Sequence, residues 1–268
     1  MAKKKDPSVT YLNKFGYNVV KLPRAGIEPL DVIGRDETTQ WLGPLPIVWK
    51  SNAGVPAPSA PRPAVAINGQ RSDSMDIKFG MKILANALAA FGASVPSLDI
   101  AYRRARKVQF SFANVTSVAV SPLEAGEYLA AGTLSTDNPV VKHYFDDPES
   151  EAYLILEVLK SDSITVTASD ERGVDVGVDV PAINQVLGAK VEAKTAAAGS
   201  STITYTSKDG PPITFGFIVD AIEYDGKQWS ISGKAPGGIL AFPAVAAGVA
   251  AEPEAPPILL STGCFVRI

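Results

Sequence analysis

Two stretches of the chain alternate apolar and polar residues, and this alternation restricts the possible folds more than any other feature of the sequence. Successive side chains of a β-strand point to opposite faces, so the alternation predicts strands with one apolar and one polar face. In the first run, residues 163–180, the apolar residues stand on even positions: Ile164, Val166, Ala168, Val174, Val176, Val178 and Val180. In the second run, residues 202–224, they stand on odd positions: Ile203, Tyr205, Ile213, Phe215, Phe217, Val219 and Ala221.

Each run has one polar interruption, which allows two interpretations. Turns at Arg172-Gly173 and Asp209-Gly210 would give hairpins or bent strands of an antiparallel sheet with one face in water. If the turns straighten, each run exceeds the about 9–11 residues that a strand needs to cross a membrane. The lipid-facing candidates are then Ile164, Val166, Val174, Val176, Val178, Ile203, Tyr205, Ile213, Phe215, Phe217 and Val219.

Other elements are predicted from capping residues and apolar spacing. Helices with N-caps at Asp6, Asp76 and Ser121 are expected over 7–15, 77–91 and 122–131. Further helices are expected over 149–160 and 181–199, strands over 17–22 and 107–121, and a poorly packed loop or edge hairpin over the proline-rich 42–68. Strands and helices do not alternate regularly, so the predicted fold class is α+β, a central twisted antiparallel sheet with surrounding helices.

Composition and charge exclude several classes of protein. Of the 268 residues, 46% are apolar and 20% charged, which is typical of a folded globular chain. One cysteine and one histidine cannot supply an internal disulfide or a zinc site of four soft ligands. The charged start of the chain is followed by no apolar segment, so we expect no signal peptide and a cytosolic protein.

Basic residues are concentrated in the first part of the chain. Residues 1–110 hold 16 Lys and Arg against 8 Asp and Glu, a net charge of +8, which leaves −11 for residues 111–268. This asymmetry favours an anionic partner such as a lipid surface, or it reflects two oppositely charged parts facing each other in one fold. No zinc-finger spacing or aromatic-basic pattern is present, so nucleic acid is not an expected partner.

An enzyme is the first alternative class of function. The single histidine, His143, stands beside Tyr144 and the acidic pair Asp146-Asp147, where it could act as a general base. No Gly-x-Ser-x-Gly elbow and no phosphate-binding loop accompany it. We therefore interpret His143 as a surface or helix-end residue and expect neither catalysis nor a cofactor.

The C-terminal tail, residues 244–268, combines a connector with a short apolar end. Residues 244–257 are rich in Ala, Pro and Gly, as in flexible linkers. Residues 258–260 and 264–266 are too apolar to stay in water at a chain end, so we expect them to be docked. They would form either a last strand that completes the core or a plug that a proteolytic cut can release.

The opening of the chain, DPSVTYLNKFGYNVVKLPR at residues 6–24 with IEPL at 27–30, closely resembles the start of bacterial gasdermins. The block 163–224 and the short apolar tail also look like this family. The resemblance implies a gasdermin-like pore-forming domain over 1–243, with linker and autoinhibitory peptide over 244–268. It also implies a monomer that a protease activates, and a large β-barrel pore in the bacterial inner membrane that kills phage-infected cells.

Carried onto this sequence, the resemblance assigns roles to several segments. The first membrane hairpin would come from within 45–120, and the second from 163–180 and 202–224, with the helix at 181–199 melting into it. The inhibitory peptide would be anchored by Ile258, Leu259, Leu260, Phe265 and Val266. The expected partners are the activating protease, membrane lipids and further copies of the chain. The alternative is a non-lytic binding module with a half-exposed antiparallel sheet.

Two departures from the family pattern change these expectations. The only cysteine is Cys264, and residue 2 is alanine, so neither acylation of an N-terminal cysteine nor N-myristoylation is expected. Lys3, Lys4 and Lys5 would dock on anionic lipid instead. The chain has no Asp beyond Asp225 and no Lys or Arg between Lys234 and Arg267, so the linker offers no site to a protease that cuts after Asp, Lys or Arg. The expected cut therefore follows Val249, Ala250, Ala251 or Glu254.

Overall fold

The structure is a computed structural model, and it describes most of the chain. The described residues are 17–231, except 37, 66, 70, 73, 94–97, 148, 188–189, 196, 198 and 225–227, together with 259–260 and 266–267. The helix expected over 7–15 lies outside them.

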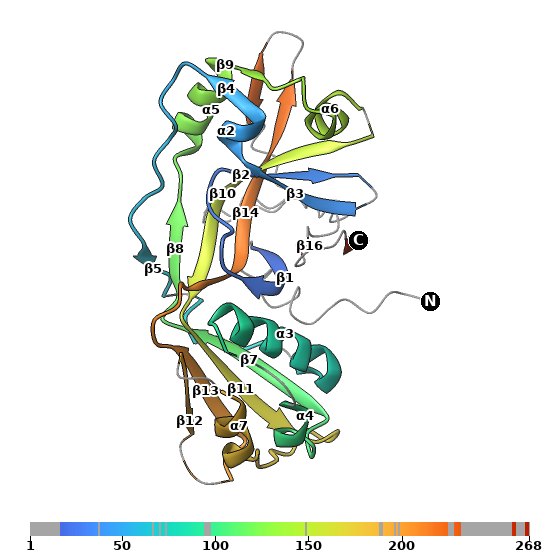
Figure 1. The fold of residues 1–268 in the computed structure, drawn as a ribbon, viewed down its shortest axis with the longest axis vertical. Helices are drawn as coiled ribbons and strands as arrows, with labels where there is room; N and C mark the ends of the chain where they lie inside the picture. Colours follow the sequence, from blue (N-terminus) through green and yellow to red (C-terminus); the bar gives the residue numbers. More distant parts are fainter. Residues whose placement is uncertain are drawn as a thin grey trace, which may run out of the picture.

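Among the described residues, ten strands form the large sheet, in the upper half of Figure 1. Its main path runs β16-β1-β14-β10-β2-β3-β17, and β15, β8 and β5 branch from it. The strands are β1 (Asn18–Arg24), β2 (Asp31–Arg35), β3 (Thr38–Pro44), β5 (Arg62–Pro63), β8 (Thr116–Ala119), β10 (Glu151–Ser161), β14 (Ile213–Tyr224), β15 (Trp229–Ile231), β16 (Leu259–Leu260) and β17 (Val266–Arg267). All its pairs are antiparallel except β1 with β16, so the expected antiparallel sheet is confirmed.

Five strands form the small sheet in the lower half of Figure 1, in the order β12-β13-β11-β7-β6. Its strands are β6 (Met75–Asp76), β7 (Lys107–Ala113), β11 (Ser163–Ser169), β12 (Val191–Thr195) and β13 (Thr202–Ser207). A third, two-stranded sheet pairs β4 (Trp49–Ser51) with β9 (Gly132–Leu134). All these pairs are antiparallel as well.

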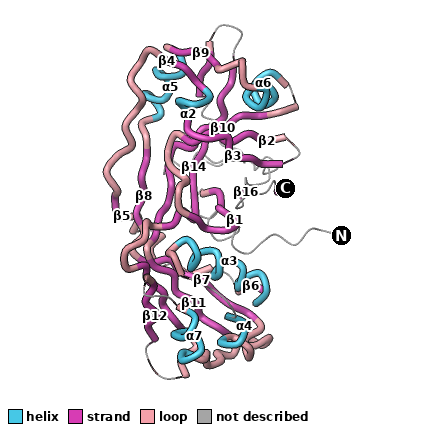
Figure 2. The backbone as a smooth tube through the Cα atoms, viewed as in Figure 1, coloured by secondary structure: helices cyan, strands magenta, loops and turns pink. Residues whose placement is uncertain are grey.

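The helices are short and lie around the sheets (Figure 2). They are α2 (Leu45–Val48), α3 (Ile77–Ala90), α4 (Leu98–Ala101), α5 (Pro122–Ala130), α6 (Pro139–Asp146) and α7 (Val180–Val186). Two predicted N-caps are confirmed: the Asp76 side chain accepts from the Lys78 N–H, and Ser121 accepts from the Glu124 N–H. Each side chain satisfies a backbone donor that the first turn of a helix leaves without a partner.

Three apolar clusters hold these layers together. The largest lies between the small sheet and α3, where Leu84 and Leu88 are buried together with Val108 of β7. The other two lie on the two faces of the large sheet, one containing Leu154 and the other Ile155 of β10. Because β10 is buried on both faces, it is the central strand of the large sheet.

Three sequence-based expectations are wrong. Residues 149–160 form most of strand β10 rather than a helix, because a strand buried on both faces carries a continuous apolar run instead of an alternating one. Among the described residues of 181–199, only those of the short α7 are helical, and Val191–Thr195 pairs with β13 as an edge strand. The stretch 42–68 is not poorly packed throughout, since Leu45 and Trp49 are fully buried.

Replacing Gly80 should destabilise the protein, because α3 packs against β7 at this glycine. A Cβ at residue 80 would collide with Val108 Cγ2. We expect Gly80→Ala to lower the free energy of unfolding by about 1–3 kcal/mol, as overpacking does in well-filled cores. Gly126 of α5 has nothing within 4 Å of such a Cβ, so Gly126→Ala should raise stability by about 0.5–1 kcal/mol. Denaturant unfolding measures both, and equal effects would contradict the packing argument.

Asp220 makes stability depend on pH. Its residue is 9% exposed on β14, opposite Leu154, and this burial raises the pKa of the carboxyl. A raised pKa means that the folded state binds the proton of this carboxyl more tightly than the unfolded state does. The resulting stabilisation is fully present when the pH is below the ordinary pKa of about 3.9, and it is lost as the pH rises through the folded-state pKa. Asp220→Asn should therefore melt at a higher temperature than the parent at pH 7, with the difference vanishing below pH 4. A difference in melting temperature that is the same at pH 7 and below pH 4 would contradict a raised pKa at Asp220.

Candidate functional site

The small sheet has an apolar face that is completely covered. Val166 and Ile203 pair with each other on neighbouring strands, and both are 0% exposed. Ile164 and Tyr205 form the next pair on the same face and are buried equally well. Helix α3 covers this face together with α4 and α7, as Figure 2 shows. Four lipid-facing candidates are thus brought together and stored against helices.

The opposite face of β11 and β13 carries a ladder of hydroxyl groups. The Oγ1 atoms of Thr165 and Thr204 lie 2.8 Å apart, and those of Thr167 and Thr202 lie 3.0 Å apart. Ser163 Oγ and Thr206 Oγ1 continue the ladder at 3.3 Å. Hydrogen-bonded pairs of this kind stabilise neighbouring strands in register. The two faces of this strand pair therefore differ in polarity, as the alternation predicts.

A buried pair of tyrosines links the small sheet to α4. The hydroxyls of Tyr102 and Tyr205 lie 2.8 Å apart, and each residue is at most 2% exposed. Burial raises the pKa of both phenols well above the usual value, so both stay neutral and share one hydrogen bond. The sequence gives no signal for this pair, because its members stand 103 positions apart.

The end of the first run does not continue as a strand. β11 stops at Ser169, and Val176 and Val178 lie in an irregular segment, half-buried and buried. Val174, at the turn that follows β11, is 59% exposed. The Asp170 carboxylate accepts hydrogen bonds from the Arg172 and Val174 N–H groups, and the backbone donors lower its pKa. The interpretation with a turn at Arg172-Gly173 holds for this structure.

The second run is divided between the two sheets. Ile203 and Tyr205 belong to β13 of the small sheet, whereas Ile213, Phe215, Phe217 and Val219 belong to β14 of the large sheet. These four side chains of β14 are each at most 1% exposed. On the opposite face Thr214, Gly216, Asp220 and Ile222 are buried too, so the expectation of a wet face is wrong along most of β14.

The C-terminal tail pairs with both edges of the large sheet. Leu259 and Leu260 of β16 run parallel to β1, opposite Val19 and Val20. Val266 of β17 lies antiparallel to β3, opposite Thr39. The strands β1 and β3 stand at opposite ends of the path β1-β14-β10-β2-β3, so the tail adds one strand at each end.

Several predicted site residues lie outside the described part of the chain. They are the basic residues Lys3, Lys4 and Lys5, the cleavage candidates Val249, Ala250, Ala251 and Glu254, and the tail residues Ile258 and Phe265. Their roles stay predictions.

His143 lies on α6 between two carboxylates. Its Nε2 is 3.1 Å from Asp36 Oδ2, and its Nδ1 is 3.7 Å from Asp147 Oδ2. The nearby Tyr144 hydroxyl donates to Gln40 Oε1. These contacts attach α6 to the β2–β3 hairpin.

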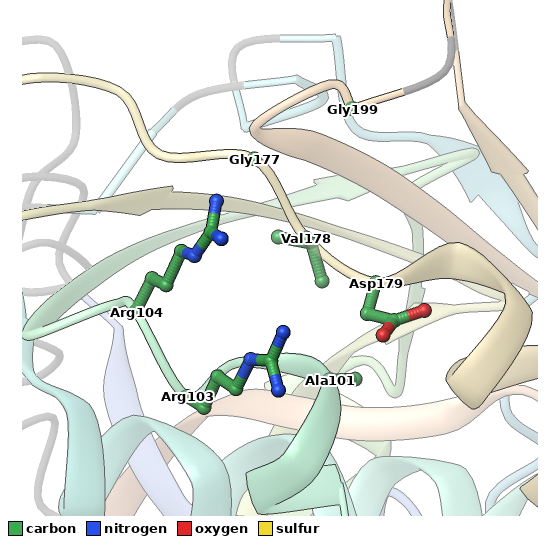
Figure 3. Close-up of a pocket in the computed structure, with 7 residues that line it drawn as sticks. All are labelled: Ala101, Arg103, Arg104, Gly177, Val178, Asp179 and Gly199. Carbon is green, nitrogen blue, oxygen red and sulfur yellow. The ribbon is translucent and has the colours of Figure 1, made fainter.

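A shallow cavity of about 200 Å³ lies at the end of the small sheet (Figure 3). Arg103 and Arg104 line one side, and Asp179 lines the other. The Asp179 carboxylate caps α7 through the Ala182 N–H, so it serves the local fold. Charges of both signs line the cavity. No group of three or more metal-binding side chains occurs among the described residues, and no described helix is long and apolar enough to cross a membrane.

Comparisons with known proteins agree on one family. The model of the Bacterial Gasdermin Family matches residues 20–233. Gasdermin bGSDM of Vitiosangium sp. (strain GDMCC 1.1324) is 36% identical over 246 residues, 91% of each chain. Gasdermin bGSDM of Lysobacter enzymogenes is 33% identical over 80% of this chain and 79% of its own. A bacterial gasdermin structure from Bradyrhizobium tropiciagri shares the fold with a TM-score of 0.58 at 16% identity, covering 86% of this chain and 92% of its own. The chain belongs to the bacterial gasdermin family.

Proposed function

We propose that the chain is a protease-activated pore-forming protein. Membership of the gasdermin family supports a pore-forming role rather than an enzymatic one. In this proposal a protease removes the C-terminal tail, and the remaining body inserts into the bacterial inner membrane and assembles as a β-barrel of many copies. The intact protein would be a cytoplasmic monomer, and the pore would kill the cell in defence against phage.

The observation that carries the proposal is the position of the tail on both edges of the large sheet. An edge strand exposes a row of backbone N–H and C=O groups that can pair with another chain. Strand β16 occupies such a row on β1, and β17 occupies one on β3. Removal of the tail would free both edges at once.

The tail also ties the two edges to each other. Leu260 on one edge and Val266 on the other are six residues apart, so the chain between them spans at most ~21 Å. A fixed link of this length restrains the separation of β1 and β3. The tail can stabilise the closed form only if it binds this form better than the open one. If β1 and β3 moved apart, the tail could no longer pair with both of them.

The covered apolar face supplies the surface that lipid would meet. Tyr205, Ile203 and Val166 are buried by α3, α4 and α7, which have to move away before these residues can face hydrocarbon. Since lipid replaces helices as the apolar environment of these strand residues, the strands themselves lose little hydrophobic free energy in the exchange. Four basic residues follow α4 and lead into β7 of the small sheet, and they would attract anionic lipid: Arg103, Arg104, Arg106 and Lys107.

Removal of residues 247–268 is the principal test. A site for a sequence-specific protease placed at Ala247 of the full-length chain allows the cut to be made in the presence of dye-filled vesicles of bacterial lipid. We expect the intact chain to leave vesicles closed and the cut chain to release the dye. A cut chain that stays monomeric in solution and releases no dye would reject the proposal and favour a non-lytic binding module.

Val174 permits a test that does not disturb the closed fold. The residue is 59% exposed, so Val174→Asp should leave the melting temperature of the intact chain unchanged. A charged side chain on the lipid face of a membrane strand is unfavourable, by as much as ~2–4 kcal/mol for a basic residue and by less for Asp. If the first run faces lipid after the cut, dye release by Val174→Asp should therefore fall at least fivefold. Val140 on α6 is similarly exposed, at 47%, and Val140→Asp serves as the matched control with undiminished release. Equal release by both variants would remove residue 174 from the lipid-facing set.

A further inference from the structure

Three chain segments pass from the small sheet into the large sheet side by side. They are β7 to β8, β11 to β10, and β13 to β14. In the small sheet β11 lies between β13 and β7, and in the large sheet β10 lies between β14 and β8. The neighbours are therefore the same on both sides of the passage. Figure 1 shows the strands changing direction where the two sheets meet, so β7 with β8 and β11 with β10 are each a strand with a bend. Residues 208–212 lie outside the strands and connect β13 to β14.

The central and outer segments keep one register through this bend. On the small-sheet side Ser163 pairs with Ala113, and on the large-sheet side Lys160 pairs with Thr116. Three positions separate the two pairs on each strand, so no residue is inserted between them. Residues 107–119 and 157–169 thus form one antiparallel ladder that is interrupted only at the bend.

Polar side chains hold the bend. Asn114 has a positive φ of 52°, and its Nδ2 donates to Asp162 Oδ1 at 3.0 Å. The Ser161 hydroxyl lies within hydrogen-bond distance of the carbonyl oxygens of Ala113 and Ser163, and it accepts from the Ser163 N–H. These bonds satisfy backbone groups that a continuous ladder would pair across the strands.

The third segment is attached at the same place. The Ser207 N–H donates to the main-chain oxygen of Asp162 at 2.8 Å, and the Ser207 hydroxyl accepts from the Gly210 N–H. Ser161 is 1% exposed and Ser207 is 9% exposed, so the two serines of this network are shielded from water, whereas the Asn114–Asp162 bond is exposed. We call Asn114, Ser161, Asp162 and Ser207 the bend clasp.

An aromatic contact fixes the angle from inside the bend. Phe112 of β7 and Phe215 of β14 stack with ring centroids 3.8 Å apart and planes 9° apart. Their strands are separated by the β10–β11 strand. In a straight sheet they would lie two strands, or about 10 Å, apart across the sheet and about four residues, or 13 Å, apart along it. The stack can therefore exist only while the segments are bent.

From these contacts we infer that the bend clasp and the Phe112–Phe215 stack lock the closed form and oppose any opening of the bend after the tail is cut. This inference rests on the proposed function. Straightening would join the ladder 107–119 with 157–169 without a change of register, and it would separate the small sheet from the core of the large one.

The residue pattern of the ladder is compatible with a straight strand pair. On even positions Val108, Phe110 and Phe112 stand opposite Ala168, Val166 and Ile164, and Val118 stands opposite Val158 beyond the bend. The polar pairs Asn114 with Asp162 and Thr116 with Lys160 separate these apolar parts. They mark the bend as the boundary between a lipid-facing portion and a portion that stays in water.

A cross-link inside the bend tests the inference directly. Phe112→Cys and Phe215→Cys are combined in the full-length chain that carries the protease site at Ala247, with Cys264→Ser so that no other thiol is present. The two thiols are joined by oxidation or by a short bis-maleimide linker before the tail is cut, and the bridge is confirmed by mass. We expect at least tenfold less dye release from the bridged protein, and full recovery when a disulfide bridge is reduced.

The two single-cysteine variants, treated with the same oxidant, control for the lost aromatic rings. They should release dye at the rate of the reduced double variant. Undiminished release by the bridged protein would overturn the inference while leaving the proposed function intact. If the parent releases no dye after the cut, the proposed function itself has failed.

Weakening the clasp should have the opposite effect. Asn114→Ala removes the bond to Asp162 from an exposed position, and after the cut it should start dye release at least threefold sooner than the parent. Asn138 also holds an exposed side-chain bond, to the Val140 N–H at the start of α6, so Asn138→Ala is the matched control with an unchanged onset. An onset in Asn114→Ala as slow as in the control would contradict a locking role for the clasp.

Discussion

An open β-sheet has to satisfy the backbone groups of its two outer strands, and the closed form of this protein depends on how that is done. Both outer strands of the central path, β1 and β3, receive their last partner from the C-terminal tail. The structure describes two residues of each partner strand, Leu259–Leu260 and Val266–Arg267. A cut in the linker before β16 releases both pairings together with the tail, which suits a switch better than a strand that pairs at one edge alone.

The small sheet answers a different requirement, because its strands must be stable in water while keeping one face apolar. Helices α3, α4 and α7 cover that face, and the hydroxyl ladder of β11 and β13 occupies the other. The strands are already paired in register, so a transition to a membrane state need not search for a new pairing. Only the covering layer and the angle to the large sheet have to change.

The sequence predicted the features that have a local physical cause. The N-caps at Asp76 and Ser121 and the alternation at 163–169 and 202–207 follow from neighbouring residues, and they are confirmed. Alternation reports the face of a strand and not its partner, so the division of the second run between two sheets was not predictable. Strand β10 was mistaken for a helix because burial on both faces removes alternation. The Tyr102–Tyr205 pair and the bend clasp join distant positions and have no local signal.

Edge pairing and the bend act on different steps of the proposed transition. The tail decides whether β1 and β3 are available, since it pairs with both. The clasp and the Phe112–Phe215 stack lie within residues 112–215 and do not involve the tail, so they persist after a cut. A barrier that survives the cut keeps the trimmed body in its closed shape in solution. Such a body has time to reach a membrane before its apolar face is exposed, which limits aggregation in water.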